Sequence, residues 1–266
     1  MVNVYLKNLK KSWLTGIVPP IVIIGFVGTI ALGWPSMQDL ILQRLETMDN
    51  PIMKAILGDL GLSGLGATWE AALFMYAGGT MNILLLFVAI FIPTRLLSTE
   101  IDKNTFDIML SLPIPRWRYL LEKFSVYLTY SLIIPISMVG IMLGSTAFLG
   151  ETLTTSLVLN YSLGYFILLF TLGSLSLLCT TIFLDSNKSL AAAGIVIGGQ
   201  YFLDSMGGML AAFGNFEAFS LFNYFSLGAI QEAGMLPIGE IIIVVSIGVL
   251  ALISALTIFH QREFAI

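Results

Sequence analysis

Long stretches without a charged side chain constrain the fold of this sequence more than any other feature. A membrane-spanning helix needs about 20 mostly apolar residues. The chain is 57% apolar and only 11% charged, whereas a soluble domain carries about 25% charged residues. The uncharged runs are residues 12–38, 71–94, 124–150, 152–184, 189–203 and 241–259. The sequence therefore predicts an all-α membrane protein.

We expect one transmembrane domain over residues 1–266 with six transmembrane helices. The expected spans are residues 14–34, 71–95, 124–148, 158–183, 189–210 and 238–259. The fifth run reaches spanning length only if its helix continues past Asp204. The pairs Gly140/Gly144 and Gly194/Gly198 have the spacing that allows helices to approach closely.

The first span is too long for a cleaved signal peptide, whose apolar core is about 7–15 residues. Trp13 and Trp34 bracket it, and 21 positions of helix between them correspond to about 32 Å. That length matches the hydrocarbon layer, with an indole at each interface. Pro35 is expected to end this helix, and Pro19-Pro20 are expected to kink or loosen it.

The distribution of Lys and Arg predicts the orientation in the membrane. With the N-terminus inside, ten of these residues fall on inner segments and only Arg44 and Lys54 on outer ones. This bias follows the positive-inside rule, so we expect a multi-pass protein of the plasma membrane with both termini cytoplasmic. The net charge of −4 disfavours nucleic-acid binding.

Three further segments are expected to lie at the membrane surfaces. Residues 1–13 predict an interfacial amphipathic helix, with Leu6, Leu9 and Trp13 on one face; a simple positively charged anchor is the alternative. Residues 34–70 predict short outer helices between the first two spans. Residues 207–237 are broken by glycines and predict a pair of short outer helices or a re-entrant hairpin between the last two.

The sequence lacks the motifs of an enzyme that acts alone. It has no phosphate-binding glycine-rich loop and no nucleophile elbow, and His260 is its only histidine and Cys179 its only cysteine. We therefore expect no catalytic residue, no metal site and no cofactor bound by this chain. An ion-coupled carrier needs ionisable groups at mid-membrane depth, and the spans offer essentially none.

Gln200 and Asp204 are the polar residues of the fifth span that could line a translocation path. The alternative is an interfacial position with interhelical hydrogen bonds. The sequence alone leaves both interpretations open.

Residues 98–123 form the most charged segment and are expected to be a cytoplasmic loop that contacts a soluble partner. Thr105–Leu110 predicts a short helix capped by Asn104 or Thr105, with Phe106, Met109 and Leu110 on one face. Pro113 and Pro115 would end that helix and stiffen the link to the third span. The alternative is a loop that only sets topology.

The last residues of this loop, just before the third span, should lie at the inner membrane interface. Basic and aromatic side chains there anchor a span at the headgroup level. The expected anchors are Arg116, Trp117, Arg118 and Lys123.

Glu100, the stretch Asn-Thr-Phe-Asp-Ile-Met-Leu-Ser-Leu-Pro-Ile-Pro-Arg and Lys123 resemble the type-2 permeases of ABC transporters. Those proteins carry a Glu, a Gly-Thr-Leu-Glu-Leu-Leu-Leu-Ser-x-Pro-like stretch and a Lys before the third span. Asn104 stands where the family usually has glycine, and asparagine tolerates similar turn geometry. The resemblance assigns ATPase coupling to Glu100, Asn104, Thr105, Phe106, Asp107, Ile108, Met109 and Leu110.

The resemblance also implies partners and a direction of transport. Such a permease pairs with a second permease chain, as a homodimer or heterodimer, and with two cytoplasmic ATPase subunits that bind ATP and Mg²⁺. It is not itself an enzyme, and it moves a drug, peptide, lipid or ion out of the cytoplasm. A membrane scaffold or sensor that anchors a soluble partner without transport is the alternative function.

Overall fold

The computed structural model describes residues 4–47, 69–102, 115–205, 219–225, 230 and 235–262. Within these ranges the regular structure is helical and no strand occurs, which confirms the expected all-α class. The helices are α1 (Val4–Lys11), α2 (Trp13–Thr47), α4 (Trp69–Asp102), α6 (Arg116–Leu149), α7 (Thr155–Phe183), α8 (Ser186–Ser205), the 3₁₀ helix η3 (Asn223–Phe225) and α11 (Ile238–Gln261).

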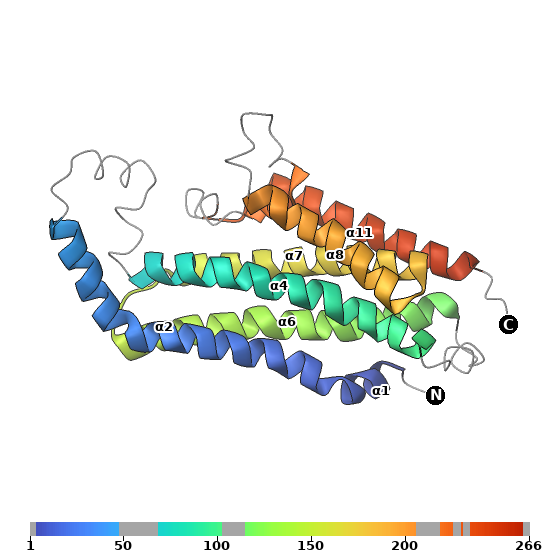
Figure 1. Cartoon of the computed structure of the whole chain (residues 1–266), viewed down its shortest axis with the longest axis horizontal. Coiled ribbons are helices and arrows are strands. Elements are labelled where there is room, and N and C mark those ends of the chain that lie inside the picture. The colour runs from blue at the N-terminus through green and yellow to red at the C-terminus, as the bar shows by residue number, and fades with distance from the viewer. Residues whose placement is uncertain are drawn as a thin grey trace.

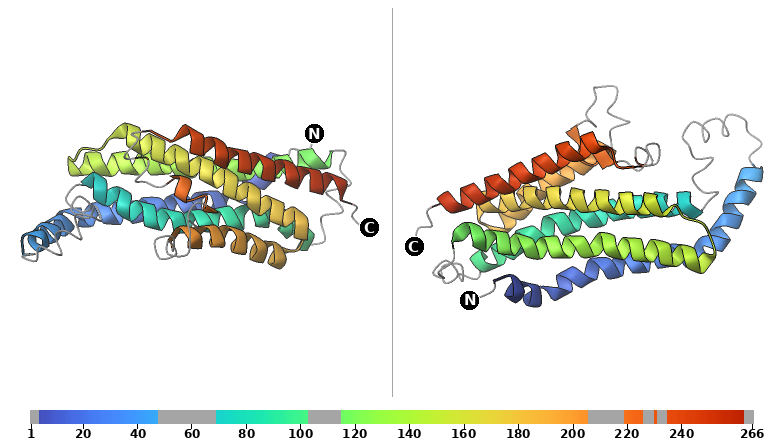
Figure 2. Two further views of the ribbon diagram at one scale, coloured as in Figure 1. Left: turned by 90° about the horizontal axis from the view of Figure 1, so that it is seen from above. Right: turned by 180° about the vertical axis from the view of Figure 1, so that it is seen from behind.

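The long helices run alongside one another, and both termini lie at the same end of the molecule (Figures 1 and 2). α7 occupies the middle, where it packs against α4, α6, α8 and α11. Its most apolar window is 56% buried, against 22–33% for the corresponding windows of α2, α6 and α11. A helix that is apolar all round is suited to such an interior position.

In the part of the chain that the structure describes, four helices are long and apolar enough to cross a membrane. They are the Trp13–Ser36 part of α2, α6, α7 and α11. Among the described residues, α4 contributes a shorter apolar stretch, Asn82–Ser98, although the whole helix has 34 residues. These helices support a multi-pass membrane protein, and the count of six spans stays a prediction.

α2 differs from the expected first span because it does not end at Pro35. It continues through Pro19, Pro20 and Pro35 to Thr47, and its light-blue end turns away from the bundle in Figure 1. A proline removes one helical hydrogen bond and bends the helix without necessarily ending it. Trp34 is also not a lipid-facing indole, since it is 1% exposed and packs edge-on against Trp69 with ring centroids 5.5 Å apart.

The predicted close helix contacts occur at other glycines. A Cβ at Gly140, Gly144, Gly194 or Gly198 would meet nothing within 4 Å in the described chain, so within these ranges the spacing of the two pairs does not correspond to a close helix contact. By contrast, a Cβ at Gly173 would overlap the ring of Tyr127, whose hydroxyl donates to the carbonyl of Leu169 at 2.6 Å. This glycine lets α6 and α7 approach closely.

Gly248 lets α11 lie directly against α7, and substituting it should loosen that contact. A Cβ there would lie 2.9 Å from Phe170 Cε1 and 3.0 Å from the Cα of Thr171. Because the backbone of Thr171 cannot rotate away, we expect Gly248→Ala to destabilise the protein by about 1–3 kcal/mol. Equilibrium unfolding in mixed detergent micelles measures this loss. Gly239→Ala, in the same helix and with open space around it, is the control, and equal stability of both variants would contradict the prediction.

Candidate functional site

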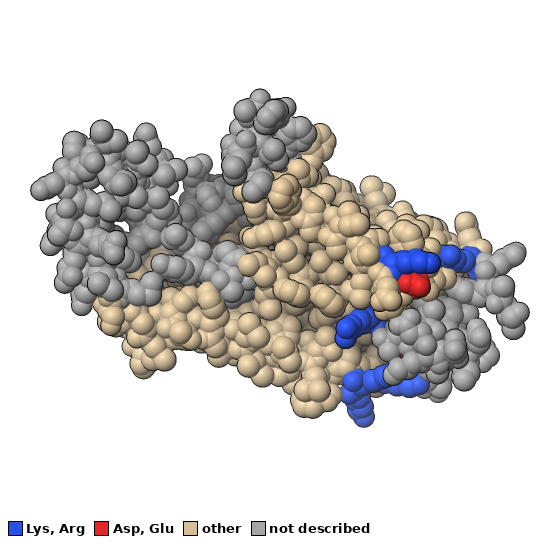
Figure 3. Space-filling model, viewed as in Figure 1, with Lys and Arg blue, Asp and Glu red and all other residues tan. Residues whose placement is uncertain are grey.

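Basic side chains gather at the end of the molecule that carries both termini (Figure 3). They come from α1, from the last turns of α4, from the first turns of α6 and α8, and from the residue after α11. They are Lys7, Lys10, Lys11, Arg95, Arg116, Arg118, Lys123, Lys188 and Arg262. This end also holds the helix ends that flank the predicted partner-binding loop.

The predicted loop of residues 98–123 is helical at both of its ends. α4 continues to Asp102, and α6 begins at Arg116 after Pro115, which has φ −64° and ψ 140°. The extended conformation of Pro115 is the one that a proline readily adopts before a helix starts. Residues 103–114 lie outside the described residues, and with them lie Asn104, Thr105, Phe106, Asp107, Ile108, Met109 and Leu110. Their coupling role therefore stays a prediction.

A buried ion pair joins α4 to α6 next to that segment. Lys123 Nζ lies 2.7 Å from Glu100 Oε2, and only 1% and 8% of the two side chains are exposed. The hydroxyl of Tyr119 donates to the same carboxylate oxygen. Lys123 Nζ also donates to the carbonyl oxygen of Leu96 and lies 5.2 Å from the centroid of the Tyr119 ring.

Helical spacing explains why these groups meet. Residues four positions apart lie on the same face of a helix, so α6 presents Tyr119 with Lys123 and α4 presents Leu96 with Glu100. Each charge is satisfied by several partners, which a buried ion pair requires. The ends of α4 and α6 that flank residues 103–114 are therefore held together.

This geometry corrects one of the expected interface anchors. Lys123 does not extend to a membrane surface, because its ammonium group is buried in the ion pair with Glu100. Trp117 is exposed, as an anchor would be, and Arg118 forms an exposed pair with Glu122 at 3.1 Å. The interfacial role of these two residues stays a prediction.

Arg116 connects the start of α6 to the end of the described chain. Its Nη1 donates to the carbonyl oxygen of Arg262 at 2.7 Å. Arg262 Nη1 donates in turn to the carbonyl oxygens of Thr181 and Ile182, both at 2.7 Å. A basic side chain commonly satisfies the free carbonyls of a helix C-terminus. Sequence reasoning missed this role of Arg262, although its position directly after α11 was a signal for it.

α1 lies along α6 and is held there by polar contacts. The hydroxyl of Tyr5 lies 2.9 Å from Thr129 Oγ1. Tyr130 OH donates to the carbonyl of Leu9 at 3.1 Å and lies 3.0 Å from Ser12 Oγ. The helix expected near residues 1–13 is present as Val4–Lys11, and the side chain of Leu6 is exposed, as a membrane-facing side chain would be.

Gln200 supports the connection that follows α8. Its Oε1 accepts a hydrogen bond from the backbone N–H of Leu221 at 2.8 Å, and its carbonyl accepts one from Ser220 Oγ at 2.9 Å. Asp204 lies half-buried near the end of the same helix. Hydrogen bonding between segments thus accounts for Gln200, and a translocation-path role for either residue stays a prediction.

Sequence reasoning missed a second buried polar group between α4 and α7. Tyr165 OH donates to Asn82 Oδ1 at 2.9 Å and lies 2.9 Å from Tyr161 OH. Both tyrosines are buried, and buried polar groups in a membrane protein need such partners. The four-residue spacing of the two tyrosines was the available signal.

The comparison with known families decides the class of this protein. The sequence model described as "ABC-2 family transporter protein" matches residues 31–227, which is more than half of the chain. The chain belongs to the ABC-2 family of transporter proteins. No curated protein and no solved structure matches it.

Membership of the ABC-2 family gives the buried ion pair a context. The matched residues include α4, residues 103–114 and the start of α6. ABC-2 permeases are membrane transport components that generally work with ATPase subunits. In this ABC-2 transporter protein, the ion pair lies at the end of the bundle that carries the basic side chains.

Breaking the ion pair from one side should destabilise the permease strongly. Lys123→Met leaves the Glu100 carboxylate buried without its cation, and we expect a loss of about 3–5 kcal/mol. Glu100→Met/Lys123→Met should recover most of that loss, because two apolar side chains need no partner. Equilibrium unfolding in mixed detergent micelles measures both variants.

Arg118→Met provides the matched control for that experiment. It breaks a pair on the same helix whose arginine is 55% exposed, and exposed pairs contribute about 0–1 kcal/mol. A Lys123→Met protein as stable as Arg118→Met would show that the buried pair does not hold α4 to α6.

Proposed function

We propose that this chain is the permease subunit of an ATP-driven exporter whose energy comes from separate ATPase subunits. It moves a lipophilic or amphipathic substrate, such as a drug, peptide or lipid, or an ion, out of the cytoplasm. Family membership supports the class of transporter. The carrying structural observation is the Glu100–Lys123 ion pair, which joins α4 and α6 on either side of residues 103–114.

The ion pair gives those residues a mechanical connection to the bundle. A displacement applied between Asp102 and Arg116 acts on two helices of 34 residues each. Because Glu100 and Lys123 are joined at 2.7 Å, the two helix ends move together rather than separately. The contact of α4 and α6 with α7 then carries the displacement into the centre of the bundle. Coupling by such rigid-body movement of packed helices is an established form of conformational change.

The proposed topology places the basic end of the bundle in the cytoplasm. The gathering of Lys and Arg around both termini (Figures 1 and 3) supports this through the positive-inside rule. The six spans would then comprise α2, α4, α6, α7, α8 and α11, in the plasma membrane. α1 would lie at the inner surface, where its lysines face anionic headgroups.

The proposed assembly contains further chains. Two ATPase subunits, with ATP and Mg²⁺, would dock on residues 103–114, and a second permease chain, identical or different, would complete the transporter. Gln200 and Asp204 are the polar residues proposed for the translocation path.

Two substitutions in the proposed coupling helix test the function. We expect Phe106→Ala and Asp107→Arg to leave the permease folded but to lower substrate-stimulated ATP hydrolysis at least tenfold, since a docking face relies on a few anchors worth about 1–2 kcal/mol or more each. The measurement uses the complex that co-purifies from the native membrane, reconstituted in lipid. Glu151→Arg, an exposed charge reversal in the turn between α6 and α7, is the control.

Two outcomes would overturn the proposal. One is normal transport with a stable complex in both coupling variants. The other is the absence of any ATPase among the co-purifying proteins. ATP turnover without vectorial movement of substrate would instead favour a membrane scaffold or sensor.

A further inference from the structure

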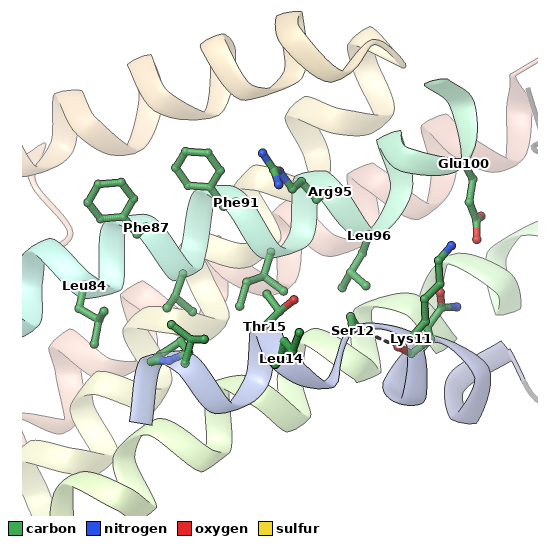
Figure 4. Close-up of a pocket in the computed structure, with 15 residues that line it drawn as sticks. Lys11, Ser12, Leu14, Thr15, Leu84, Phe87, Phe91, Arg95, Leu96 and Glu100 are labelled. Atoms are coloured by element: carbon green, nitrogen blue, oxygen red, sulfur yellow. Dashed lines mark hydrogen bonds between the residues drawn. The ribbon is translucent and has the colours of Figure 1, made fainter. Parts of the chain in front are cut away.

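A cavity lies between the α1–α2 segment and α4, at the basic end of the molecule (Figure 4). Its volume is about 680 Å³, which falls within the range of about 300–1,000 Å³ for small-molecule sites. Figure 4 shows Phe87, Phe91 and Arg95 in one row along α4, with Lys11 and Leu14 on the facing segment. We call this cavity the α2–α4 groove.

The walls of the α2–α4 groove are mostly apolar. Leu14 and Val18 on α2 and Leu84 and Phe87 on α4 line it. Leu14, Val18 and Phe87 are each more than half exposed in the described chain. Hydrocarbon or another chain is therefore needed to cover these side chains, because contact between water and so much apolar surface is unfavourable.

The mouth of the groove carries positive charge. Lys11 and Arg95 line it, and both side chains are exposed. Glu100 also lines it, but its carboxylate is neutralised by Lys123 and accepts from Tyr119. The mouth thus presents two basic side chains, which complement an anionic headgroup.

The length of the groove matches one leaflet of a bilayer. Leu84 and Arg95 lie 11 positions apart in one helix, which corresponds to about 17 Å. Half of a hydrocarbon core of about 30 Å is about 15 Å. An acyl chain that begins at the charged mouth therefore reaches the apolar end of the groove.

We propose that the α2–α4 groove is a binding site for an anionic phospholipid. The phosphate lies between Lys11 and Arg95, and one acyl chain lies along Leu14, Val18, Leu84 and Phe87. The lipid completes the packing between α2 and α4, and its headgroup bridges the α1–α2 segment to α4. This site depends on the groove and its charges, and it stands whether or not the proposed transport function holds.

Retention of defined lipids by the purified full chain tests the headgroup contact. The probes are phosphatidylglycerol and phosphatidylcholine, added to delipidated protein in detergent and measured by native mass spectrometry. We expect the protein to retain phosphatidylglycerol in preference to phosphatidylcholine. K11Q/R95Q should weaken that retention about 30-fold, the scale of two basic contacts to an anionic lipid. K10Q/K188Q removes the same charge from the same end but outside the groove, and it should retain the lipid.

A second substitution tests the acyl-chain contact without altering any charge. Val18→Trp fills the groove, and it should lose phosphatidylglycerol while both cations remain. Ile136→Trp, at an exposed position of α6 outside the groove, should retain it. Thermal unfolding of each variant in detergent confirms that the compared proteins are folded.

Three results would overturn the proposal. The first is equal retention of the two lipids, and the second is equal retention by K11Q/R95Q and K10Q/K188Q. The third is a chain that retains no phospholipid and changes from dimer to monomer on Val18→Trp in light-scattering measurements. That third result would assign the groove to contact with a second permease chain.

Discussion

The buried pair between Glu100 and Lys123 is the interaction on which the proposed function of this permease depends. Two charges inside an apolar bundle are tolerated only when each is fully partnered, and here Tyr119 and the carbonyl of Leu96 complete the set. The pair lies where α4 and α6 flank residues 103–114. This ion pair is costly to bury and joins α4 to α6 at one place. It fixes the relative position of these two long helices, which apolar packing alone specifies less sharply.

The same end of the molecule is reinforced by backbone-directed contacts. Arg116 and Arg262 link the start of α6 to the ends of α11 and α7, and α1 is held on α6 through Tyr5 and Tyr130. At the opposite end, Trp34 packs edge-on against Trp69, and Glu70 accepts hydrogen bonds from the backbone N–H and the hydroxyl of Thr154. Among the described residues, most of the basic side chains thus lie at one end of the bundle, which agrees with an asymmetric position in a membrane.

The helices and the family could be predicted from sequence because both depend on local patterns. Uncharged runs mark spans by length alone, and the Glu100–Lys123 segment carries a recognisable motif. Contacts between distant segments could not be predicted in this way. By its place in the sequence, Lys123 is predicted to be an interface anchor. The fold instead places Glu100 of α4 beside it. Pro35 likewise predicts the end of a helix. In the structure the helix continues past it, and the neighbouring Trp34 packs against Trp69. Close approach depends on which face of a helix a glycine occupies: a Cβ at Gly248 would press on α7, whereas one at Gly194 would meet nothing in the described chain.

The central position of α7 has a consequence for where a substrate can pass. α4, α6, α8 and α11 all pack against this one helix, and close fits such as Tyr127 over Gly173 leave little space around it. A channel along the axis of a single chain would require α7 to leave the place that the other helices surround. A route along the outer faces of the bundle, or between two chains, would leave α7 and its contacts intact.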